Sequence, residues 1–564
     1  MTFKEYPYQR PDMQKLQDAF KSALDEFETA ESAAVQSACI DTINQLRFDF
    51  NTQSTLAYIR HSINTEDPFY DEEKNFFNQN SPVFSHLNNL FYQALTKTPF
   101  RDELKKQKGD LLFKKAALSL KTFSPDIMPD LQEENRLASD FQKLYTSAQI
   151  DFEGKKRTLT QMGPFAQSKD RAMRKKASQA VSAFMAEHES QFDAIYDQLV
   201  KVRTKMAKTL GYDSFVPLAY NRWGRMDYGP DAVKRYREQV LQSIVPLNAT
   251  LSERKRKRLK LDTLYHYDLA LEFESGNPTP KGKKDWLLKQ AEAMYKAMAP
   301  ETDTFFQFMQ DHDLLDLEAK KGKAGGGYCT FLPNYGAPFI FANFNGTKGD
   351  VDVLTHEAGH AFQMFMSRHH EVPEYLTASL DIMEIHSMSM EFFAWPWVDK
   401  FFLEDTEKYK FTHLTHALSL IAYASAIDDF QHVVYENPDL GIEGRKKAWQ
   451  TIDRTYFPHK VYDDNDYLKR GNGWQSIMHL YAVPFYMIDY ALAQVCAFQY
   501  WVRAQSDQQA SWDSYLSLCK AGGSDTFLGL LKLAGLNNPF EAGTMQALMP
   551  EIKAYLDGVD DTKL

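Results

Sequence analysis

The segment His356-Glu357-Ala358-Gly359-His360 constrains the fold of this chain more than any other feature. Two histidines four residues apart can share one ligand if the segment is helical, because a helix brings positions i and i+4 onto one face. The apolar neighbours, Val353-Leu354 before it and Ala361-Phe362 after it, predict that this helix is buried. Two buried imidazoles and a carboxylate need partners, which a metal ion supplies. The segment therefore predicts a metal site on a packed helix.

The residue types of this segment indicate a particular chemistry. His356 and His360 can bind one zinc ion, and Glu357 points to the side where an attacking water would lie, so it can act as the general base. Gly359 costs about 1 kcal/mol in a helix interior, so we expect another element to pack closely against it. The alternative, a surface helix that carries the string by coincidence, is disfavoured by the apolar flanks.

A catalytic zinc ion usually takes three protein ligands, and several residues after the motif could be the third. The candidates are Glu371, Glu374, Glu384, His386 and Glu391. In the helical pattern IMEIHSMSMEFF, Glu384 lies among apolar residues, and Glu391 shares its face seven residues later. His386 is turned about 200° from that face, and Glu371 and Glu374 look like solvated loop residues. We predict Glu384 as the third ligand and Glu391 as a support behind it.

Most of the chain has helical patterning. Leu16, Phe20, Leu24 and Phe27 recur at steps of four, four and three, which marks one helix face, and similar patterns continue to about residue 200. Residues 322–346 break this pattern with turn-forming glycines and two stretches rich in β-formers, YCTFL and PFIFANF. We expect a mainly α fold with a small antiparallel β-sheet beside the motif helix.

Composition limits the remaining possibilities. A chain of 564 residues can hold more than one domain, and its net charge of −11 argues against a nucleic-acid-binding surface. We expect no membrane span, since no run of about 18 apolar residues occurs, and no secretory signal in the charged first residues. Four cysteines without a CxxC pair are typical of a reducing compartment. We therefore expect a cytoplasmic protein.

The strings DVDVLTHEAGHAF and MEIHSMSMEFF resemble the thimet-oligopeptidase-like (M3) family of zinc peptidases, specifically its bacterial oligoendopeptidase F branch. GYDSFVPLAYNRWGRMDYGPDAV is also similar, so the resemblance runs from about Tyr212 to the end. It implies two ligands from HExxH and a third from the glutamate at position 384. It also implies one zinc ion per chain and two largely helical lobes around a deep substrate channel. We divide the sequence into an N-terminal helical region, 1–200, and a zinc-peptidase catalytic region, 201–564.

A second group of candidate residues lies near the C-terminus. His479, Tyr486 and Tyr490 are spaced seven and four, which predicts one face of a helical stretch after the loop Gly471-Asn472-Gly473. An aromatic core helix is the alternative. The family resemblance implies that His479 and the two tyrosines line the cleft and that a tyrosine hydroxyl stabilises the oxyanion. Which tyrosine does so stays open.

The sequence predicts two further site features. The stretch 337–344 resembles the family's edge strand, which pairs with the substrate backbone, and an ordinary buried strand is the alternative. The corresponding substrate-binding residues are Ala337, Phe339, Phe341 and Asn343. Asp352, one turn before His356, could hydrogen-bond a ligand imidazole or could cap the helix N-terminus.

The combined prediction is a zinc endopeptidase that hydrolyses internal bonds of short unfolded peptides. Its partners would be those peptides, without nucleic acid or membrane, and the sequence specifies no oligomeric state. One alternative is a related zinc carboxypeptidase of the gluzincin type. Another is an inert peptide-binding protein on the same scaffold, against which the presence of Glu357 argues.

Overall fold

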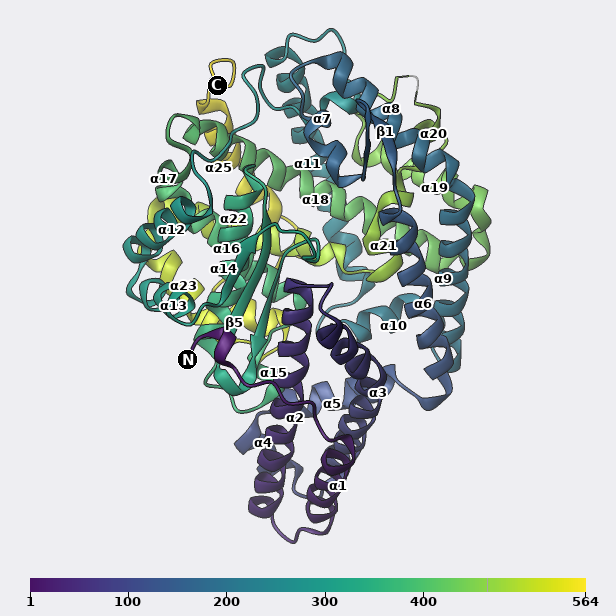
Figure 1. Ribbon diagram of the computed structural model, residues 1–564, viewed down its shortest axis with the longest axis vertical. Helices are drawn as coiled ribbons and strands as arrows, with labels where there is room; N and C mark the ends of the chain where they lie inside the picture. The colour runs from purple at the N-terminus through teal and green to yellow at the C-terminus, as the bar shows by residue number, and fades with distance from the viewer. Residues whose placement is uncertain (464) are drawn as a thin grey trace. The chain divides into compact units, whose positions relative to one another are not determined.

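The computed structural model describes residues 1–463 and 465–564, and helices dominate it (Figure 1). The predicted mainly α class is therefore confirmed. The chain forms two compact units, each assembled from three separate segments. Unit 1 comprises Met1–Lys121, Thr279–Thr406 and Cys496–Leu536, and unit 2 comprises Thr122–Pro278, Glu407–Val495 and Asn537–Leu564. The division of the sequence at residue 200 stays a prediction.

Unit 1 contains the predicted metal motif and a small sheet. Its helices are α1 (Met13–Thr29), α2 (Ala33–Ile63), α3 (Pro68–Lys97), α4 (Arg101–Lys108), α5 (Asp110–Thr122), α12 (Lys284–Met298), α13 (Pro300–Asp311), α14 (Gly349–Ser367), α15 (Pro373–Leu376), α16 (Leu380–Phe393), α17 (Asp399–Phe402), α23 (Gln508–Ala521) and α24 (Phe527–Leu533). Its strands are β3 (Leu315–Glu318), β4 (Tyr328–Leu332) and β5 (Ala337–Phe344).

Helix α1 shows how the predicted periodicity becomes packing. Asp12 caps its N-terminus by accepting hydrogen bonds from the backbone N–H groups of Gln14 and Lys15. Phe20, Leu24 and Phe27 are buried, as expected for one apolar face. That face packs on α2 and α3, so the N-terminal region of unit 1 is held by side-chain burial along amphipathic helices.

The sheet in unit 1 has the strand order β3-β5-β4 and lies beside α14 (Figure 1). Strands β4 and β5 are antiparallel, which confirms the predicted pair, and Gly336 between them adopts the left-handed φ of +53° that the tight turn requires. Strand β3 pairs in parallel with the other side of β5 and was not predicted. The sheet is therefore mixed, with β5 at its centre.

Unit 2 is built mainly from helices with one small hairpin. Its helices are α6 (Met128–Thr146), α7 (Gly163–Ala166), α8 (Arg171–Glu187), α9 (Glu189–Thr209), α10 (Phe215–Arg222), α11 (Pro230–Arg258), α19 (Gly441–Tyr456), α20 (Asp466–Lys469), α21 (Met478–Ala482) and α25 (Thr544–Gly558). The hairpin consists of β1 (Ile150–Phe152) and β2 (Lys155–Arg157). Two of the boundaries between the units fall within α18 (Thr406–Glu436) and α22 (Met487–Ser506), and another falls at the last residue of α5. Throughout the described ranges, no helix combines the length and apolar character that a membrane span requires.

Candidate active site

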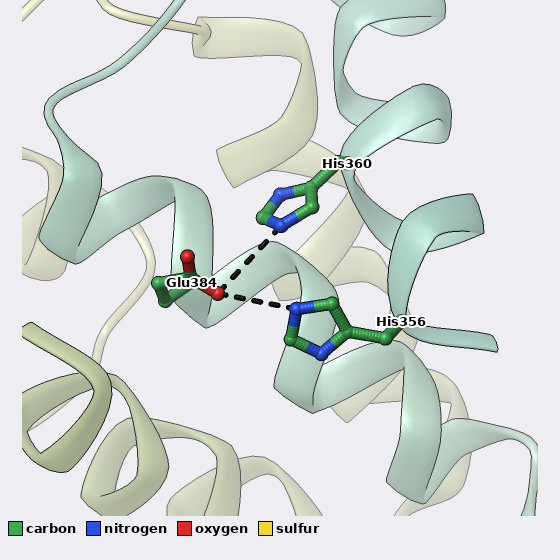
Figure 2. Close-up of side chains that lie close together, drawn as sticks. All are labelled: His356, His360 and Glu384. Carbon is green, nitrogen blue, oxygen red and sulfur yellow. Dashed lines mark ion pairs between the residues drawn. The ribbon is translucent and has the colours of Figure 1, made fainter. Parts of the chain in front are cut away.

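Helix α14 presents the two motif histidines on one face. Asp350 anchors the start of the helix by accepting hydrogen bonds from the backbone N–H groups of Asn345 and Gly346, at 2.9 and 2.8 Å. Nearly two turns later the rings of His356 and His360 lie with centroids 5.0 Å apart and planes at 87°. Figure 2 shows both rings pointing from α14 toward α16. The i, i+4 spacing thus brings two imidazoles to one point.

Glu384 on α16 completes this group. Its Oε2 atom lies 3.3 Å from Nε2 of His356 and 3.6 Å from Nε2 of His360 (Figure 2). Its carboxylate is almost fully buried and accepts a hydrogen bond from Ser387 Oγ at 2.9 Å. The two imidazoles of α14 and the carboxylate of α16 therefore point toward one another from two packed helices (Figure 2).

The spacing of these three side chains fits a metal ion. Two ligand atoms at about 2.1 Å from a tetrahedral zinc ion lie about 3.4 Å apart, close to the 3.3 and 3.6 Å found here. The ligand atoms of His356, His360 and Glu384 all lie within 4.8 Å of one another. Two imidazoles and one carboxylate also form a common zinc donor set. These residues could hold one metal ion.

Glu391, two turns after Glu384 on the same face of α16, contacts the far side of the His356 imidazole. Its Oε1 atom lies 2.6 Å from Nδ1 of His356. Burial lowers the pKa of His356, but hydrogen bonds to the carboxylates of Glu384 and Glu391 outweigh burial and raise this pKa well above its ordinary value. The ring nitrogen that faces Glu384 thus has a strong attraction for a cation, either a proton or a metal ion.

Gly359 explains how α14 and α16 approach so closely. A Cβ atom at this position would lie 2.6 Å from both the carbonyl oxygen of His386 and the Cα atom of Ser387, which are backbone atoms of α16. The expected close packing at Gly359 is therefore confirmed. His386 itself is fully buried, and burial lowers its pKa to about 3. The imidazole of His386 lies outside the group that could hold a metal.

Glu357 is half-buried and acts electrostatically on the same site. Burial lowers the pKa of His360, while the carboxylates of Glu384, Glu357 and Glu391 act in the opposite direction. Burial also raises the pKa of the Cys329 thiol on β4, and Glu357 adds to that rise. The Glu357 carboxylate therefore acts on the pKa of both His360 on α14 and Cys329 on β4.

Two other acidic residues differ from their expected surroundings. Asp352 pairs with Lys348 in the first turn of α14, a partner that was not predicted, and this helix has no side-chain N-cap. Glu374 was expected to be solvated, but it is buried against Arg47, with oxygen and nitrogen 2.6 Å apart. Tyr92 also donates to Glu374, at 2.5 Å. The expectation for Glu374 was wrong because its partners come from α2 and α3, far away in the sequence.

In unit 2, His479, Tyr486 and Tyr490 form one aromatic cluster. The ring centroid of His479 lies 5.9 Å from that of Tyr486 and 6.2 Å from that of Tyr490. The two tyrosine rings are 5.0 Å apart, and the hydroxyl of Tyr490 donates to that of Tyr486 at 3.1 Å. These side chains come together as the sequence indicated.

The backbone that carries this cluster differs from the prediction. One continuous helical stretch was expected, but α21 ends at Ala482 and α22 begins at Met487. Pro484 lies in the break, and Phe485 adopts a left-handed φ of +65°. The spacing of seven and four residues therefore does not place His479, Tyr486 and Tyr490 on one face of a single helix. Pro484 was the sequence signal for this break, since proline removes a helical N–H group and clashes with the preceding turn.

The predicted substrate strand also needs a correction. Ala337, Phe339, Phe341 and Asn343 lie on β5, which was expected to be an edge strand. Strand β5 is instead the central strand, with β3 along one side and β4 along the other, so it is not an edge strand. The edge strand next to it is β4, whose residues Tyr328–Phe331 are half-buried. The prediction was wrong because nothing in the four residues of β3, LDLE, indicates that they pair with the second side of β5.

Strand β4 has an outward-facing backbone edge. The N–H group of Ile340 donates to Leu314 on the β3 side, so the backbone groups of Phe339 and Phe341 point toward β4. Their partners on β4 are Thr330 and Tyr328. The alternate residues of β4, Cys329 and Phe331, therefore direct their backbone N–H and C=O groups away from β5.

Comparison with known proteins gives the same assignment as the site. The mainly helical fold and the His-His-Glu group define the class of protein, a mainly α chain with a group of side chains that could hold a metal ion. A profile of peptidase family M3 matches residues 165–280 and 303–550, and a profile of the peptidase M3 N-terminal domain matches residues 3–123. The chain belongs to peptidase family M3, in its oligoendopeptidase F branch, which confirms the resemblance found in the sequence.

Individual relatives agree with this assignment. A solved structure of PZ peptidase A with an inhibitor is 51% identical, with a TM-score of 0.95 and 100% coverage of both chains. A candidate oligoendopeptidase F from Bacillus anthracis strain Ames is 49% identical, with a TM-score of 0.91, covering 100% of this chain and 99% of that one. Oligopeptidase PepF of Bacillus subtilis (strain 168) is 24% identical over 397 residues, 67% of this chain. The matched region spans 56% of the length of PepF.

Proposed function

We propose that this protein is a zinc-dependent endopeptidase that hydrolyses internal peptide bonds of short, unfolded oligopeptides. The observation that carries the proposal is the convergence of His356, His360 and Glu384, at distances that suit one zinc ion. Membership of peptidase family M3 supplies the reaction class. The names of PZ peptidase A and oligopeptidase PepF agree with peptides as substrates.

In the proposed reaction, His356, His360 and Glu384 hold the zinc ion, one per chain. The bound ion would polarise the scissile carbonyl and make a water molecule more acidic. Glu357 accepts the proton of the attacking water and then transfers it to the leaving amine. Glu391 keeps the proton of His356 on Nδ1, so that Nε2 remains available as a ligand.

The oxyanion that forms in this reaction needs hydrogen-bond donors. We assign this role to Tyr486, with His479 beside it. Because the hydroxyl of Tyr490 donates to that of Tyr486, the Tyr486 oxygen carries extra positive polarisation and its own proton becomes a better donor. Tyr490 therefore supports Tyr486 in this scheme. The choice between the two tyrosines, open in the sequence, rests on this hydrogen bond.

We propose that the substrate backbone pairs with β4 instead of β5. The outward N–H and C=O groups of Cys329 and Phe331 can add a peptide strand to the sheet, and such pairing is independent of side-chain identity. An extended peptide is required for this pairing, which is why unfolded peptides are the expected substrates. Folded proteins, nucleic acids and membranes are not expected as partners.

We place the protein in the cytoplasm. Its four cysteines, Cys39, Cys329, Cys496 and Cys519, are free thiols. Free buried thiols persist in a reducing compartment.

The test combines metal analysis with one conservative variant. Glu357→Gln keeps the size of the side chain but removes the base, so it should bind one zinc ion per chain and lose about 10²–10⁴-fold in kcat. The exposed Glu371 on the loop after α14 provides the matched control, and Glu371→Gln should retain wild-type activity. A Glu357→Gln variant with normal zinc content and a wild-type rate would show that the mechanism is wrong.

The substrate in this test also separates the alternatives. A fluorogenic peptide blocked at both ends is cleaved by an endopeptidase, whereas a carboxypeptidase needs a free C-terminus. An inert peptide-binding protein would bind the same peptide without cleavage. Cleavage of the blocked peptide at an internal bond is the expected result.

A further inference from the structure

The segment between α21 and α22 has an unusual backbone. It follows the short helix that carries His479 and leads directly to Tyr486, with Tyr490 in the first turn of α22. Within it, Phe485 is fully buried in a left-handed conformation, with φ of +65°. A bulky residue in this region costs on the order of 1–3 kcal/mol and persists only where surrounding contacts determine it.

Two side chains from the motif NRWGR hold the carbonyl groups of this segment. Trp223 Nε1 donates to the carbonyl oxygen of Pro484 at 2.7 Å, and its ring lies 5.6 Å from that of Tyr486. Arg225 Nη2 donates to the carbonyl oxygen of Phe485 at 2.6 Å. The same nitrogen donates to Asp489 Oδ1 at 2.7 Å, and both side chains of this ion pair are buried.

Asp489 connects Arg225 to the short segment that carries Tyr486 and Tyr490. It lies in the first turn of α22, one residue before Tyr490, and its backbone N–H donates to the carbonyl oxygen of Tyr486. Arg225 therefore binds the chain at two points: at Phe485, immediately before Tyr486, and at Asp489, between Tyr486 and Tyr490. Hydrogen bonds between charged partners in a buried setting are among the stronger ones in proteins.

Other buried side chains hold the same segment from further sides. Gln431 Oε1, on α18, accepts a hydrogen bond from the backbone N–H of Phe485 at 2.7 Å. Arg203, on α9, donates to the carbonyl oxygens of Leu480 and Tyr481, at 2.9 and 2.5 Å. These carbonyls belong to the end of α21, where a helix leaves its acceptors without intrahelical partners. The left-handed turn is thus fixed by donors and acceptors from several helices of unit 2.

We infer that Trp223 and Arg225 are positioning residues for the reaction, which hold the backbone on both sides of Tyr486 and so preorganise the hydroxyls of Tyr486 and Tyr490. The inference rests on the proposed function. It gives Trp223 and Arg225 of the NRWGR motif a role that is separate from the metal site and from the substrate strand. Preorganised donors contribute to catalysis because they need no rearrangement as charge develops, and a displacement of about 1 Å can cost about 10²-fold in rate.

The experiment compares Trp223→Phe, Arg225→Lys and Asp489→Asn in the full zinc-loaded protein. Trp223→Phe keeps an aromatic ring and removes one hydrogen bond, while Arg225→Lys keeps the charge and loses the guanidinium geometry. We expect kcat to fall about 5–100-fold with KM within about threefold, because donors to an oxyanion act in the transition state. Zinc content should stay at one per chain.

Arg258 provides the matched control in the same unit. It is buried, donates to the carbonyl oxygen of Glu272 at 2.7 Å and pairs with Asp561, so it is a structural arginine elsewhere in unit 2. Arg258→Lys should lower the free energy of unfolding and leave kcat unchanged. Where Arg225→Lys lowers the yield of folded protein, Trp223→Phe and Asp489→Asn still decide the question.

A double-mutant cycle with Tyr486→Phe separates positioning from general damage. If Trp223 acts through Tyr486, the double variant Trp223→Phe/Tyr486→Phe should be no slower than Tyr486→Phe alone. Either of two results would overturn the positioning role alone. In the first, the kcat of the double variant falls by the product of the two single losses. In the second, Trp223→Phe and Arg225→Lys keep the wild-type kcat while Tyr486→Phe is slow. A wild-type kcat in Tyr486→Phe would instead refute the proposed oxyanion role, and the positioning role with it.

Discussion

Glu391 Oε1 lies 2.6 Å from Nδ1 of His356, while Nε2 of the same ring lies 3.3 Å from Oε2 of Glu384. One imidazole therefore faces two carboxylates, one at each nitrogen. A proton on Nδ1, directed at Glu391, leaves the lone pair on Nε2 for a metal ion. Glu391 thus selects the tautomer of His356 and fixes the plane of its ring. The ligand is His356, and Glu391 only supports it.

Replacement of Glu391 should weaken zinc binding. The Glu391→Gln variant loses the charge that holds the Nδ1 proton, so we expect zinc affinity to fall about 10–100-fold. Zinc titration against a competing chelator measures this change. Glu436, which contacts Nδ1 of His432 at 3.1 Å in unit 2, provides a matched control. Equal zinc affinities for Glu391→Gln, Glu436→Gln and the wild type would contradict the proposed role.

At Gly359, an alanine should change the free energy of unfolding in the direction opposite to that expected from helix propensity. Alanine is favoured over glycine by about 1 kcal/mol in a helix interior, yet a Cβ atom at this position would lie 2.6 Å from backbone atoms of His386 and Ser387. Gly359→Ala should therefore destabilise unit 1 by about 1–3 kcal/mol and weaken zinc binding, because α16 carries Glu384. Chemical denaturation and zinc titration measure the two effects.

Gly444 in α19 provides the matched control for Gly359. A Cβ atom there would meet the side chain of Leu440 at 2.6 Å, and a flexible side chain can move where a backbone cannot. Gly444→Ala should therefore leave the free energy of unfolding unchanged or raise it. An increase in stability for Gly359→Ala, with normal zinc binding, would show that α14 and α16 can separate without cost.

The three candidate metal ligands could be predicted from the sequence because residues close to each of them in the chain indicate its position. His356 and His360 are related by helix geometry alone, and the apolar residues around Glu384 marked a second buried helix. Even the tight packing at Gly359 followed from the cost of glycine in a helix. In each case the pattern of a short segment carried the information.

What the sequence did not reveal depends on non-local pairing. Strand β3 is four residues long, and nothing in LDLE indicates that it pairs with β5, so the edge was assigned to the wrong strand. The burial of Glu374 depends on Arg47, which follows from no local pattern. The break between α21 and α22 was different, since Pro484 could have revealed it.

Strand β4 makes a prediction about substrate binding. Phe331 directs its N–H away from β5, so Phe331→Pro should preserve the sheet while it removes one donor to the peptide. A hydrogen bond of this kind contributes about 1 kcal/mol, so KM should rise about fivefold. Steady-state kinetics with the blocked fluorogenic peptide measure this. Thr330→Pro is the contrast, because its N–H pairs with β5 and its loss should destabilise unit 1. The two variants would behave alike if the edge of β4 played no part.

Lys115 makes the stability of unit 1 depend on pH in a defined direction. Its Nζ atom donates to the carbonyl oxygens of Glu374 and Gly523, and burial, opposed by the Glu374 carboxylate, lowers the pKa of Lys115 from 10.5 to about 8. Between these values the unfolded chain binds more protons than the folded one, so the free energy of unfolding rises with pH. The cost of the buried charge is complete below about pH 8 and disappears near the unfolded pKa of about 10.4.

The variant Lys115→Met has no proton to lose at this position. Relative to it, the wild type should gain on the order of 3 kcal/mol in free energy of unfolding between about pH 8 and pH 10.5. Urea denaturation of both proteins across this range measures the difference and cancels the titration of other groups. The exposed neighbour Lys114, which pairs with Asp110, provides the control, and Lys114→Met should show no such gain. A constant difference between wild type and Lys115→Met would mean that Lys115 keeps its ordinary pKa, with its charge solvated in the folded protein.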